Sequence, residues 1–172
     1  MPPITLVTDS AEQTREIGAR LGRLLRPGDV VLLHGDLGAG KTTLTQGIAQ
    51  GLGVREQIQS PTFTLVAEHE GQTVEEAPIR LYHLDLYRLA GEEDLDSFGW
   101  EQYLAPVDGV AVVEWPERAG SWLPEEYLLV RLELDGADRR RVMVEAVPPN
   151  SDMTDVVSEL RGAVTSGRAA AH

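Results

Sequence analysis

The stretch Gly35-Asp36-Leu37-Gly38-Ala39-Gly40-Lys41-Thr42 is a complete phosphate-binding loop (P-loop) of the form G-x-x-x-x-G-K-[ST]. In such a loop the glycines allow backbone N–H groups to curl around phosphate oxygens, while the lysine adds a positive charge and the hydroxyl can bind magnesium. The stretch therefore predicts a site for a nucleoside triphosphate with Mg²⁺. The expected nucleotide-binding residues are Asp36, Leu37, Gly38, Ala39, Gly40, Lys41, Thr42 and Thr43.

The segments on both sides of this loop have the pattern that the motif requires. Residues 30–33, Val-Val-Leu-Leu, form a short apolar run that is typical of a buried parallel strand. After the loop, Leu44, Ile48 and Leu52 recur at helical spacing. The order strand, loop, helix favours a true P-loop over a glycine-rich turn that merely resembles one.

The rest of the chain predicts an α/β protein. A first strand is expected at residues 4–7, followed by a helix that Asp9 or Ser10 caps. Residues 110–113 form a second buried strand, and residues 127–134 and 139–147 alternate as an antiparallel hairpin. We therefore expect a P-loop NTPase three-layer fold with a mostly parallel central sheet and an antiparallel edge hairpin.

The segments between these strands are less regular. Residues 60–66 begin as a rigid turn and continue as a strand, and the polar residues 69–78 are expected to connect it to a strand at 79–86. Residues 92–104 have apolar positions at helical intervals and are predicted to form a helix.

Length and composition favour one main domain. With 172 residues, of which 42% are hydrophobic, the chain can bury one large core. We predict a P-loop ATPase domain over residues 1–147 and a C-terminal extension over 148–172. Within the extension, residues 152–164 predict a short helix, and residues 166–172 are expected to form a frayed tail.

The charge balance limits the possible partners. The formal net charge is -13, from 15 Lys+Arg against 28 Asp+Glu, which disfavours a broad nucleic-acid-binding surface. Zero cysteines exclude disulfides and thiolate metal sites. No N-terminal stretch of this sequence combines basic residues with an apolar core of signal-peptide length, and no apolar run reaches membrane-spanning length. We expect a cytoplasmic protein with no membrane partner.

Two carboxylates follow predicted central strands and are candidates for the chemistry. Asp85 ends the strand 81–84, and Glu114 ends the strand 110–113. The carboxyl ends of parallel strands face the phosphates in such folds, where Mg²⁺ takes anionic oxygen ligands. One acid then suits magnesium and the other suits orientation of the attacking water. The more apolar strand favours Glu114 for the metal, but the pattern alone leaves the two roles open.

Other candidate positions lie near these strands. Ser60 and Thr62 occupy the place of a nucleotide-sensing loop. Ordinary β-propensity is the alternative explanation for Thr62 and the preferred one for Thr64. Trp115 is either a core-capping aromatic or a contact for a partner or nucleotide. His83 lies in a strand pattern and is interpreted as a packed histidine rather than a catalyst.

Four blocks together carry a resemblance to a known family. They are residues 35–43 (GDLGAGKTT), 60–66 (SPTFTLV), 83–89 (HLDLYRL) and 113–118 (VEWPER). In this order they resemble the bacterial TsaE family, also called YjeE, over roughly residues 4–147. The P-loop alone indicates a huge superfamily, whereas the other three blocks are distinctive. The acidic connection around residues 71–77 departs from the family pattern.

The resemblance implies a function and assigns roles. It implies the ATPase subunit required to make threonylcarbamoyladenosine beside the anticodon of tRNAs that read codons beginning with A. The TsaD and TsaB proteins would carry out the transfer from a threonylcarbamoyl-adenylate, and this subunit would meet tRNA only through them. The resemblance places Thr42 and Asp85 on the magnesium side and Glu114 at the catalytic end of the nucleotide, and it implies adenine contacts near Ala11. The P-loop motif itself gives Lys41 a catalytic role through its positive charge.

A second class of function is a small-molecule kinase that transfers the γ-phosphoryl group to an acceptor. A kinase usually adds a lid with arginines, but Arg88 and Arg118 are isolated here. Residues 139–141, Arg-Arg-Arg, are the only cationic cluster, and we favour a solvated strand over phosphate-facing arginines. No N-K-x-D guanine signature is present, which disfavours a GTPase. The resemblance makes the ATPase the favoured function.

Overall fold

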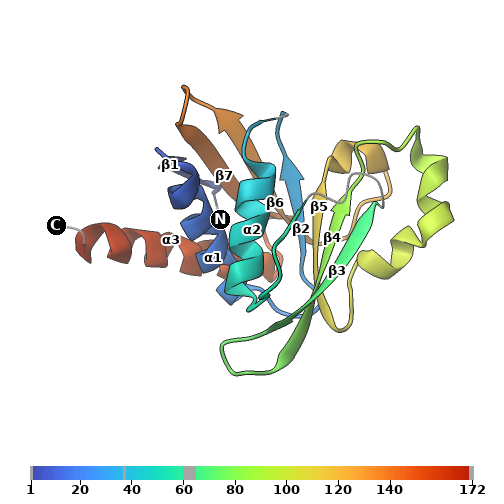
Figure 1. Cartoon of the computed structure of the whole chain (residues 1–172), viewed down its shortest axis with the longest axis horizontal. Coiled ribbons are helices and arrows are strands. Elements are labelled where there is room, and N and C mark those ends of the chain that lie inside the picture. Colours follow the sequence, from blue (N-terminus) through green and yellow to red (C-terminus); the bar gives the residue numbers. More distant parts are fainter. Residues whose placement is uncertain (1, 37, 60–64, 171–172) are drawn as a thin grey trace.

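The computed structural model describes residues 2–36, 38–59 and 65–170. Within these residues, seven strands form one sheet, with α-helices and short 3-10 helices (η) on its two faces (Figure 1). The elements are β1 (Ile4–Thr8), α1 (Ala11–Leu24), β2 (Val30–His34), α2 (Lys41–Gly51), β3 (Val66–Gln72), β4 (Pro78–Asp85), η1 (Glu92–Phe98), η2 (Trp100–Tyr103), β5 (Gly109–Glu114), η3 (Pro116–Ala119), β6 (Tyr127–Leu134), β7 (Arg140–Val147) and α3 (Met153–Ala170).

The sheet is parallel at its centre and antiparallel toward its edges. Its strand order is β1-β7-β6-β2-β5-β4-β3. β6, β2, β5 and β4 pair in parallel, whereas β7 and β3 run antiparallel to their inner neighbours. This confirms the predicted fold class and the predicted β6–β7 hairpin. The hairpin is covered on its outer side by β1, which pairs antiparallel with β7.

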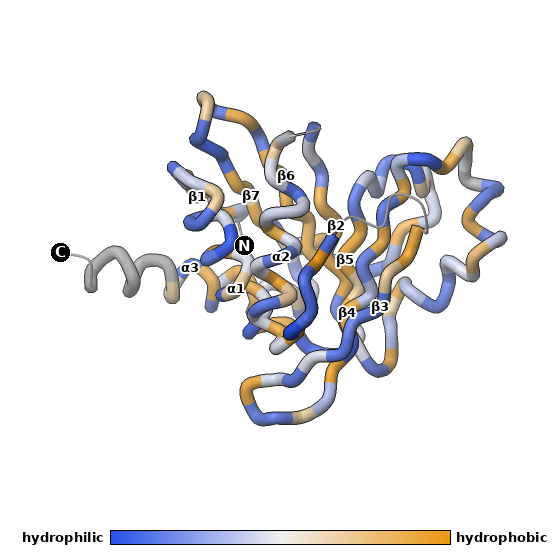
Figure 2. Tube along the Cα trace, in the orientation of Figure 1, coloured by the Kyte–Doolittle hydropathy of each residue, from blue (hydrophilic) through white to orange (hydrophobic). Residues whose placement is uncertain are grey.

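The central strands are buried on both faces. In β2, Val31 and Leu33 point into a core beneath the three α-helices, whereas Val30 and Leu32 belong to a second core on the opposite face. All four side chains are at most 1% exposed. Figure 2 shows apolar residues along β2 and β5, as expected for parallel strands that are covered on both sides.

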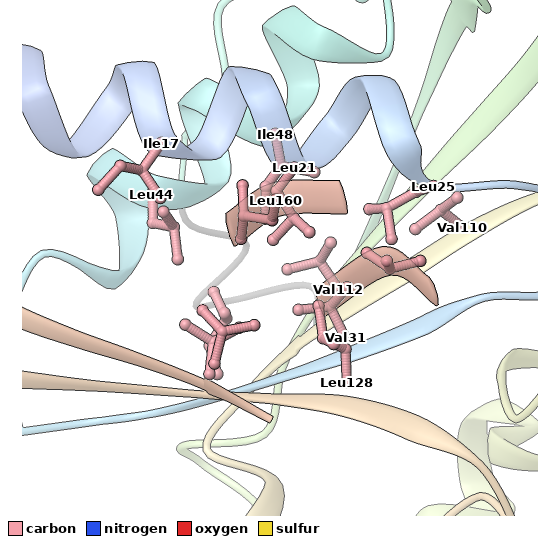
Figure 3. Close-up of a cluster of buried hydrophobic side chains, with 14 of the residues drawn as sticks. Ile17, Leu21, Leu25, Val31, Leu44, Ile48, Val110, Val112, Leu128 and Leu160 are labelled. Atoms are coloured by element: carbon pink, nitrogen blue, oxygen red, sulfur yellow. The ribbon is translucent and has the colours of Figure 1, made fainter. Parts of the chain in front are cut away.

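The larger core lies between the sheet and helices α1, α2 and α3. Ile17 and Leu21 of α1 and Leu44 and Ile48 of α2 point toward Val112 and its neighbours on the sheet (Figure 3). Ser10 caps α1, because its Oγ accepts a hydrogen bond of 3.1 Å from the backbone N–H of Gln13. The cap sets the start of α1 at Ala11.

Helices α1 and α2 approach closely because glycines face each other across their contact. A Cβ atom at Gly18 would lie 2.4 Å from the carbonyl oxygen of Leu44, and one at Gly47 would lie 2.1 Å from that of Arg15. Gly22 repeats this arrangement one turn further along α1. Side chains at these positions would push the helices apart, so the glycines fix how the P-loop helix α2 sits against α1.

The opposite face is covered by 3-10 helices rather than by the α-helix predicted for residues 92–104. The prediction of one continuous helix was wrong, because Gly99, with φ of 73°, ends η1 and precedes η2. Leu95, Trp100 and Tyr103 still point into the second core, at 2%, 2% and 6% exposure. The helical spacing therefore identified the buried positions but not the continuous helix.

Two other predicted boundaries differ from the structure. The connection predicted for residues 69–78 is shorter, because β3 continues to Gln72 and pairs with β4 up to Pro78. The polar residues of β3 belong to an exposed edge strand. The helix predicted for residues 152–164 is also longer: α3 runs to Ala170, through most of the predicted tail, and Val157 and Leu160 are buried in the larger core. Among the described helices, none is long and apolar enough to cross a membrane.

We expect Gly47→Ala to destabilise the fold. Its Cβ would overlap the backbone of α1, and overpacking of this kind costs about 1–3 kcal/mol. Urea unfolding measures the change. Gly162→Ala in α3 is the control, since no atom lies within 4 Å of its added Cβ and alanine is the better helix former, by about 0.8–1 kcal/mol. Equal stability of Gly47→Ala and the wild type would contradict the close-contact role of this glycine.

Candidate nucleotide-binding site

A cleft lies at the carboxyl ends of β2, β5 and β4, where α2 begins. Its volume is about 530 Å³. The residues that line it come from distant parts of the sequence: Ala11, Thr14, Gly38, Gly40, Lys41, Thr42, Thr43, Asp85, Tyr87, Glu114, Trp115, Asp138 and Arg140. The structure thus brings the P-loop, both candidate carboxylates and Trp115 to one cavity.

The P-loop has the backbone geometry of an anion cradle. Gly38 and Gly40 have φ of 81° and 102°, a region that side chains rarely adopt, and the N-terminus of α2 follows directly at Lys41. Of the predicted loop residues, Asp36 and Ala39 do not line the cleft, and the side chain of Ala39 is buried in the core instead. Ala39 would therefore contribute only its backbone to a bound phosphate.

Ala11 reaches the cleft from a different element. It is the first residue of α1, and Thr14 on the next turn lines the same cavity. The hydroxyl of Thr14 lies 2.7 Å from that of Thr8 at the end of β1, which ties the start of the helix to the sheet. The position of Ala11 suits the adenine contact that the resemblance implies, and that contact stays a prediction.

Lys41 is the only lysine in the chain and is held in an unusual environment. Its side chain is 6% exposed, and its Nζ lies 3.5 Å from the centre of the Trp115 ring. Among the described residues Nζ has no hydrogen-bond partner. Burial lowers the pKa of Lys41, and the negative charges of Glu114, Glu117, Asp85 and Asp36 oppose that shift. A buried cation that meets an aromatic ring but has no hydrogen-bond acceptor among the described residues is well suited to receive an anionic ligand.

Trp115 forms the aromatic wall of the cleft. Its backbone has φ of 59°, which is rare for a residue other than glycine, and η3 starts immediately after it at Pro116. The ring of Tyr87 packs against Trp115 with 4.9 Å between centroids. The structure gives the half-buried ring a place in both settings, because it packs against the second core and also covers Lys41 in the cleft. A contact with a nucleotide or a partner stays a prediction.

Asp85 and Glu114 are side by side at the ends of neighbouring strands. They are paired in the register of β4 and β5, and both are buried, at 5% and 3% exposure. Oδ1 of Asp85 accepts a hydrogen bond of 3.0 Å from the backbone N–H of Tyr87, which orients this carboxylate. The parallel pairing thus delivers two carboxylates to the wall of the cleft beside Lys41.

His83 is buried, as the strand pattern predicted, but the sequence did not reveal its contact. Its Nε2 lies 2.6 Å from Oε2 of Glu114, and its side chain is 0% exposed. His83 and Glu114 are 31 residues apart, so only the register of β4 and β5 brings them together.

The three consecutive arginines at residues 139–141 have different surroundings. Arg139 pairs with Asp9 at 3.3 Å and Arg141 with Glu133 at 3.5 Å, which agrees with a solvated strand. For Arg140 the preferred interpretation was wrong. Its guanidinium donates to the carbonyl oxygen of Gly38 at 3.3 Å and lines the cleft, because alternation along β7 turns it toward the P-loop.

Some predicted site residues lie outside the described part of the chain. They are Leu37 of the P-loop and Ser60, Thr62 and Thr64 of the expected nucleotide-sensing loop.

The fold and the cleft define an α/β protein with a P-loop at the carboxyl edge of its parallel strands. Comparison with protein families gives the narrower assignment, since residues 8–142 match the model described as "Threonylcarbamoyl adenosine biosynthesis protein TsaE". The chain belongs to the TsaE family.

Curated relatives support this assignment. The chain is 43% identical over 138 residues to the TsaE protein of Treponema pallidum, covering 80% of this chain and 97% of the relative. It is 37% identical over 146 residues to the TsaE protein of Bacillus subtilis, covering 85% and 87%. Both relatives are named tRNA threonylcarbamoyladenosine biosynthesis proteins.

A solved structure shows the same fold. The crystal structure of Bacillus subtilis YdiB matches with a TM-score of 0.73 and 33% sequence identity, covering 94% of this chain and 96% of YdiB. The arrangement of helices and sheet is thus shared over nearly the whole chain.

We expect Lys41→Ala to lose productive triphosphate binding. The change removes the cation beside the P-loop, and charged contacts of this kind contribute about 1.5–3 kcal/mol, or about 10–150-fold in Kd. Calorimetric titration with ATP and magnesium measures it. Arg80→Ala is the control, since it removes a cation from the opposite end of β4. Wild-type affinity in a folded Lys41→Ala protein would show that the cleft is not the triphosphate site.

Proposed function

We propose that this protein is the ATP-binding and ATP-hydrolysing subunit required for threonylcarbamoyladenosine formation in tRNA. The observation that carries the proposal is the cleft that joins the P-loop to the paired carboxylates Asp85 and Glu114. Family membership supports the pathway, and the P-loop supports binding of a nucleoside triphosphate.

The residues present fit a magnesium ion bound together with a triphosphate. The hydroxyl-bearing Thr42 and the carboxylate of Asp85 line the same cavity, and both are hard oxygen donors. The ammonium of Lys41 lies beside them and has no hydrogen-bond partner in the described part of the chain, so it suits the phosphates. Magnesium, when bound, would neutralise charge that develops on the phosphate oxygens.

Glu114 is suited to a different task. It lies on the strand next to Asp85, and its Oε2 is already engaged by His83 at 2.6 Å. A carboxylate held in place at the wall of the cleft can orient a water molecule for attack on the γ-phosphate. We therefore place Asp85 with Thr42 on the magnesium side and Glu114 with Lys41 at the reacting end.

The charge of the chain supports action through partner proteins. A net charge of -13 opposes direct binding to the tRNA phosphate backbone. In the proposed assembly TsaD and TsaB bind the tRNA and carry out the transfer, and ATP turnover by this subunit changes the state of their complex. The competing function, a small-molecule kinase, would instead pass the γ-phosphoryl group to an acceptor.

Substitution of the two acids separates their roles. Asp85→Asn is expected to weaken magnesium-dependent nucleotide binding, whereas Glu114→Gln is expected to slow hydrolysis more than binding. Magnesium titrations with a fluorescent nucleotide and single-turnover hydrolysis measure the two effects. Glu126→Gln serves as the control because it changes an exposed carboxylate outside the cleft lining. The reverse pattern would exchange the assignments of Asp85 and Glu114.

ATP hydrolysis by the isolated protein is expected to be slow and to rise on assembly. A supplied arginine finger contributes about 10³–10⁵ in rate, and binding to partners can order the site. Phosphate release is measured with the protein alone, with TsaB and TsaD, and with tRNA added. Labelled ATP distinguishes the two functions: inorganic phosphate as the only labelled product supports the ATPase, and a phosphorylated small molecule supports the kinase. Rapid turnover that no partner changes would rule out the switch.

A further inference from the structure

A buried histidine, His83, contacts Glu114, one of the two carboxylates that line the cleft. Nε2 of His83 and Oε2 of Glu114 are 2.6 Å apart, with side-chain exposures of 0% and 4%. In the register of β4 and β5, His83 lies opposite Val112. Val112 is two residues before Glu114 on β5, so the side chains of Val112 and Glu114 point to the same face of the sheet. The two side chains therefore meet diagonally on the sheet face that carries the P-loop helix.

A histidine is an unfavourable choice for this position if packing alone decides it. On the same face, Leu81, Val110 and Val112 are apolar and fully buried. Nδ1 of His83 is buried and has no hydrogen-bond partner among the described residues. An unpartnered buried polar atom destabilises a fold, so an apolar residue would pack here at lower cost. What histidine supplies is the bond from Nε2 to Glu114.

We propose that His83 is a positioning residue that fixes the carboxylate of Glu114 for ATP hydrolysis. The inference rests on the proposed function of Glu114. With Glu114 ionised, its oxygens only accept hydrogen bonds, so Nε2 of His83 carries the proton and donates. One carboxylate oxygen is thereby held inside the sheet, and the other is left to act in the cleft that Glu114 lines.

Fixing this side chain matters because water must be held in one orientation for attack. A glutamate side chain has several rotatable bonds, and a displacement of about 1 Å at a reacting group can cost about 100-fold in rate. The backbone beyond Glu114 is already constrained, since Trp115 has φ of 59° and begins η3. His83 supplies the corresponding constraint on the carboxylate itself.

Nuclear magnetic resonance on the full chain tests the contact without any nucleotide. A buried imidazole N–H that donates to a carboxylate gives a downfield proton resonance that exchanges slowly with water. We expect this resonance in the wild type, its loss in His83→Leu and its displacement in Glu114→Gln. Absence of the resonance from the wild-type protein would overturn the proposed hydrogen bond.

Single-turnover hydrolysis in the assembled complex tests the role. His83→Leu is expected to slow hydrolysis by about 10–100-fold, the usual effect of removing a group that orients a ligating or reacting side chain. Nucleotide affinity is expected to stay within about twofold of wild type. His83→Gln, whose amide can donate from the place of Nε2, is expected to recover much of the rate.

His69→Leu is the matched control. His69 is also a buried histidine near a glutamate, with Nδ1 3.6 Å from Oε2 of Glu56, but it lies on β3 away from the cleft lining. It is expected to hydrolyse ATP at the wild-type rate. In a Glu114→Gln background, His83→Leu is expected to have no further effect, because the two residues act as a unit.

The possible outcomes separate this inference from the proposed function. Wild-type hydrolysis by His83→Leu would overturn the positioning role and leave the ATPase standing. A loss of nucleotide affinity and of thermal stability as large in His83→Gln as in His83→Leu would show a structural role and also overturn it. A wild-type complex that hydrolyses no ATP would overturn the proposed function and the positioning role together, while the resonance would still report the contact.

Discussion

The parallel pairing of β4, β5 and β2 is the constraint on which the site depends. Parallel strands end at the same edge of a sheet, so this pairing places Asp85 beside Glu114 and both beside the loop that leaves β2. The strands can be parallel only because both faces are covered, by α-helices on one side and by 3-10 helices on the other. The two apolar cores therefore determine where the carboxylates meet the P-loop.

The cleft brings a buried cation and two buried carboxylates close together. Lys41 is buried against the ring of Trp115, and burial lowers its pKa, whereas four carboxylates nearby favour its charged form. A triphosphate with its metal would add anionic oxygens for Lys41 and a cation for Asp85. Both sets of desolvated charges would gain partners in one binding event. For this, phosphate oxygens would have to enter the space beside Nζ of Lys41, next to the ring of Trp115.

Local patterns in the sequence predicted the local elements and the residues of the motif. The P-loop, the buried strands β2 and β5 and the β6–β7 hairpin each depend on neighbouring residues, so spacing alone was sufficient. Contacts between distant segments could not be predicted in this way. The hydrogen bond between His83 and Glu114 requires the register of β4 and β5. The hydrogen bond from Arg140 to the carbonyl oxygen of Gly38 joins residues 102 positions apart. The need for glycine at facing positions of α1 and α2, such as Gly18 and Gly47, follows from the packing of the two helices and not from either segment alone.

The composition of the cleft also bears on why the proposed ATPase activity would need partners. Among its described lining residues, Lys41 and Arg140 are the basic side chains, and Arg140 already donates to the carbonyl oxygen of Gly38. Charge that develops on the γ-phosphate would then be met by Lys41, the α2 N-terminus and the metal. An additional cation has to come from outside this lining. A protein surface that supplies it would both complete the site and sense whether ATP is present, which is the coupling that a nucleotide-driven switch requires.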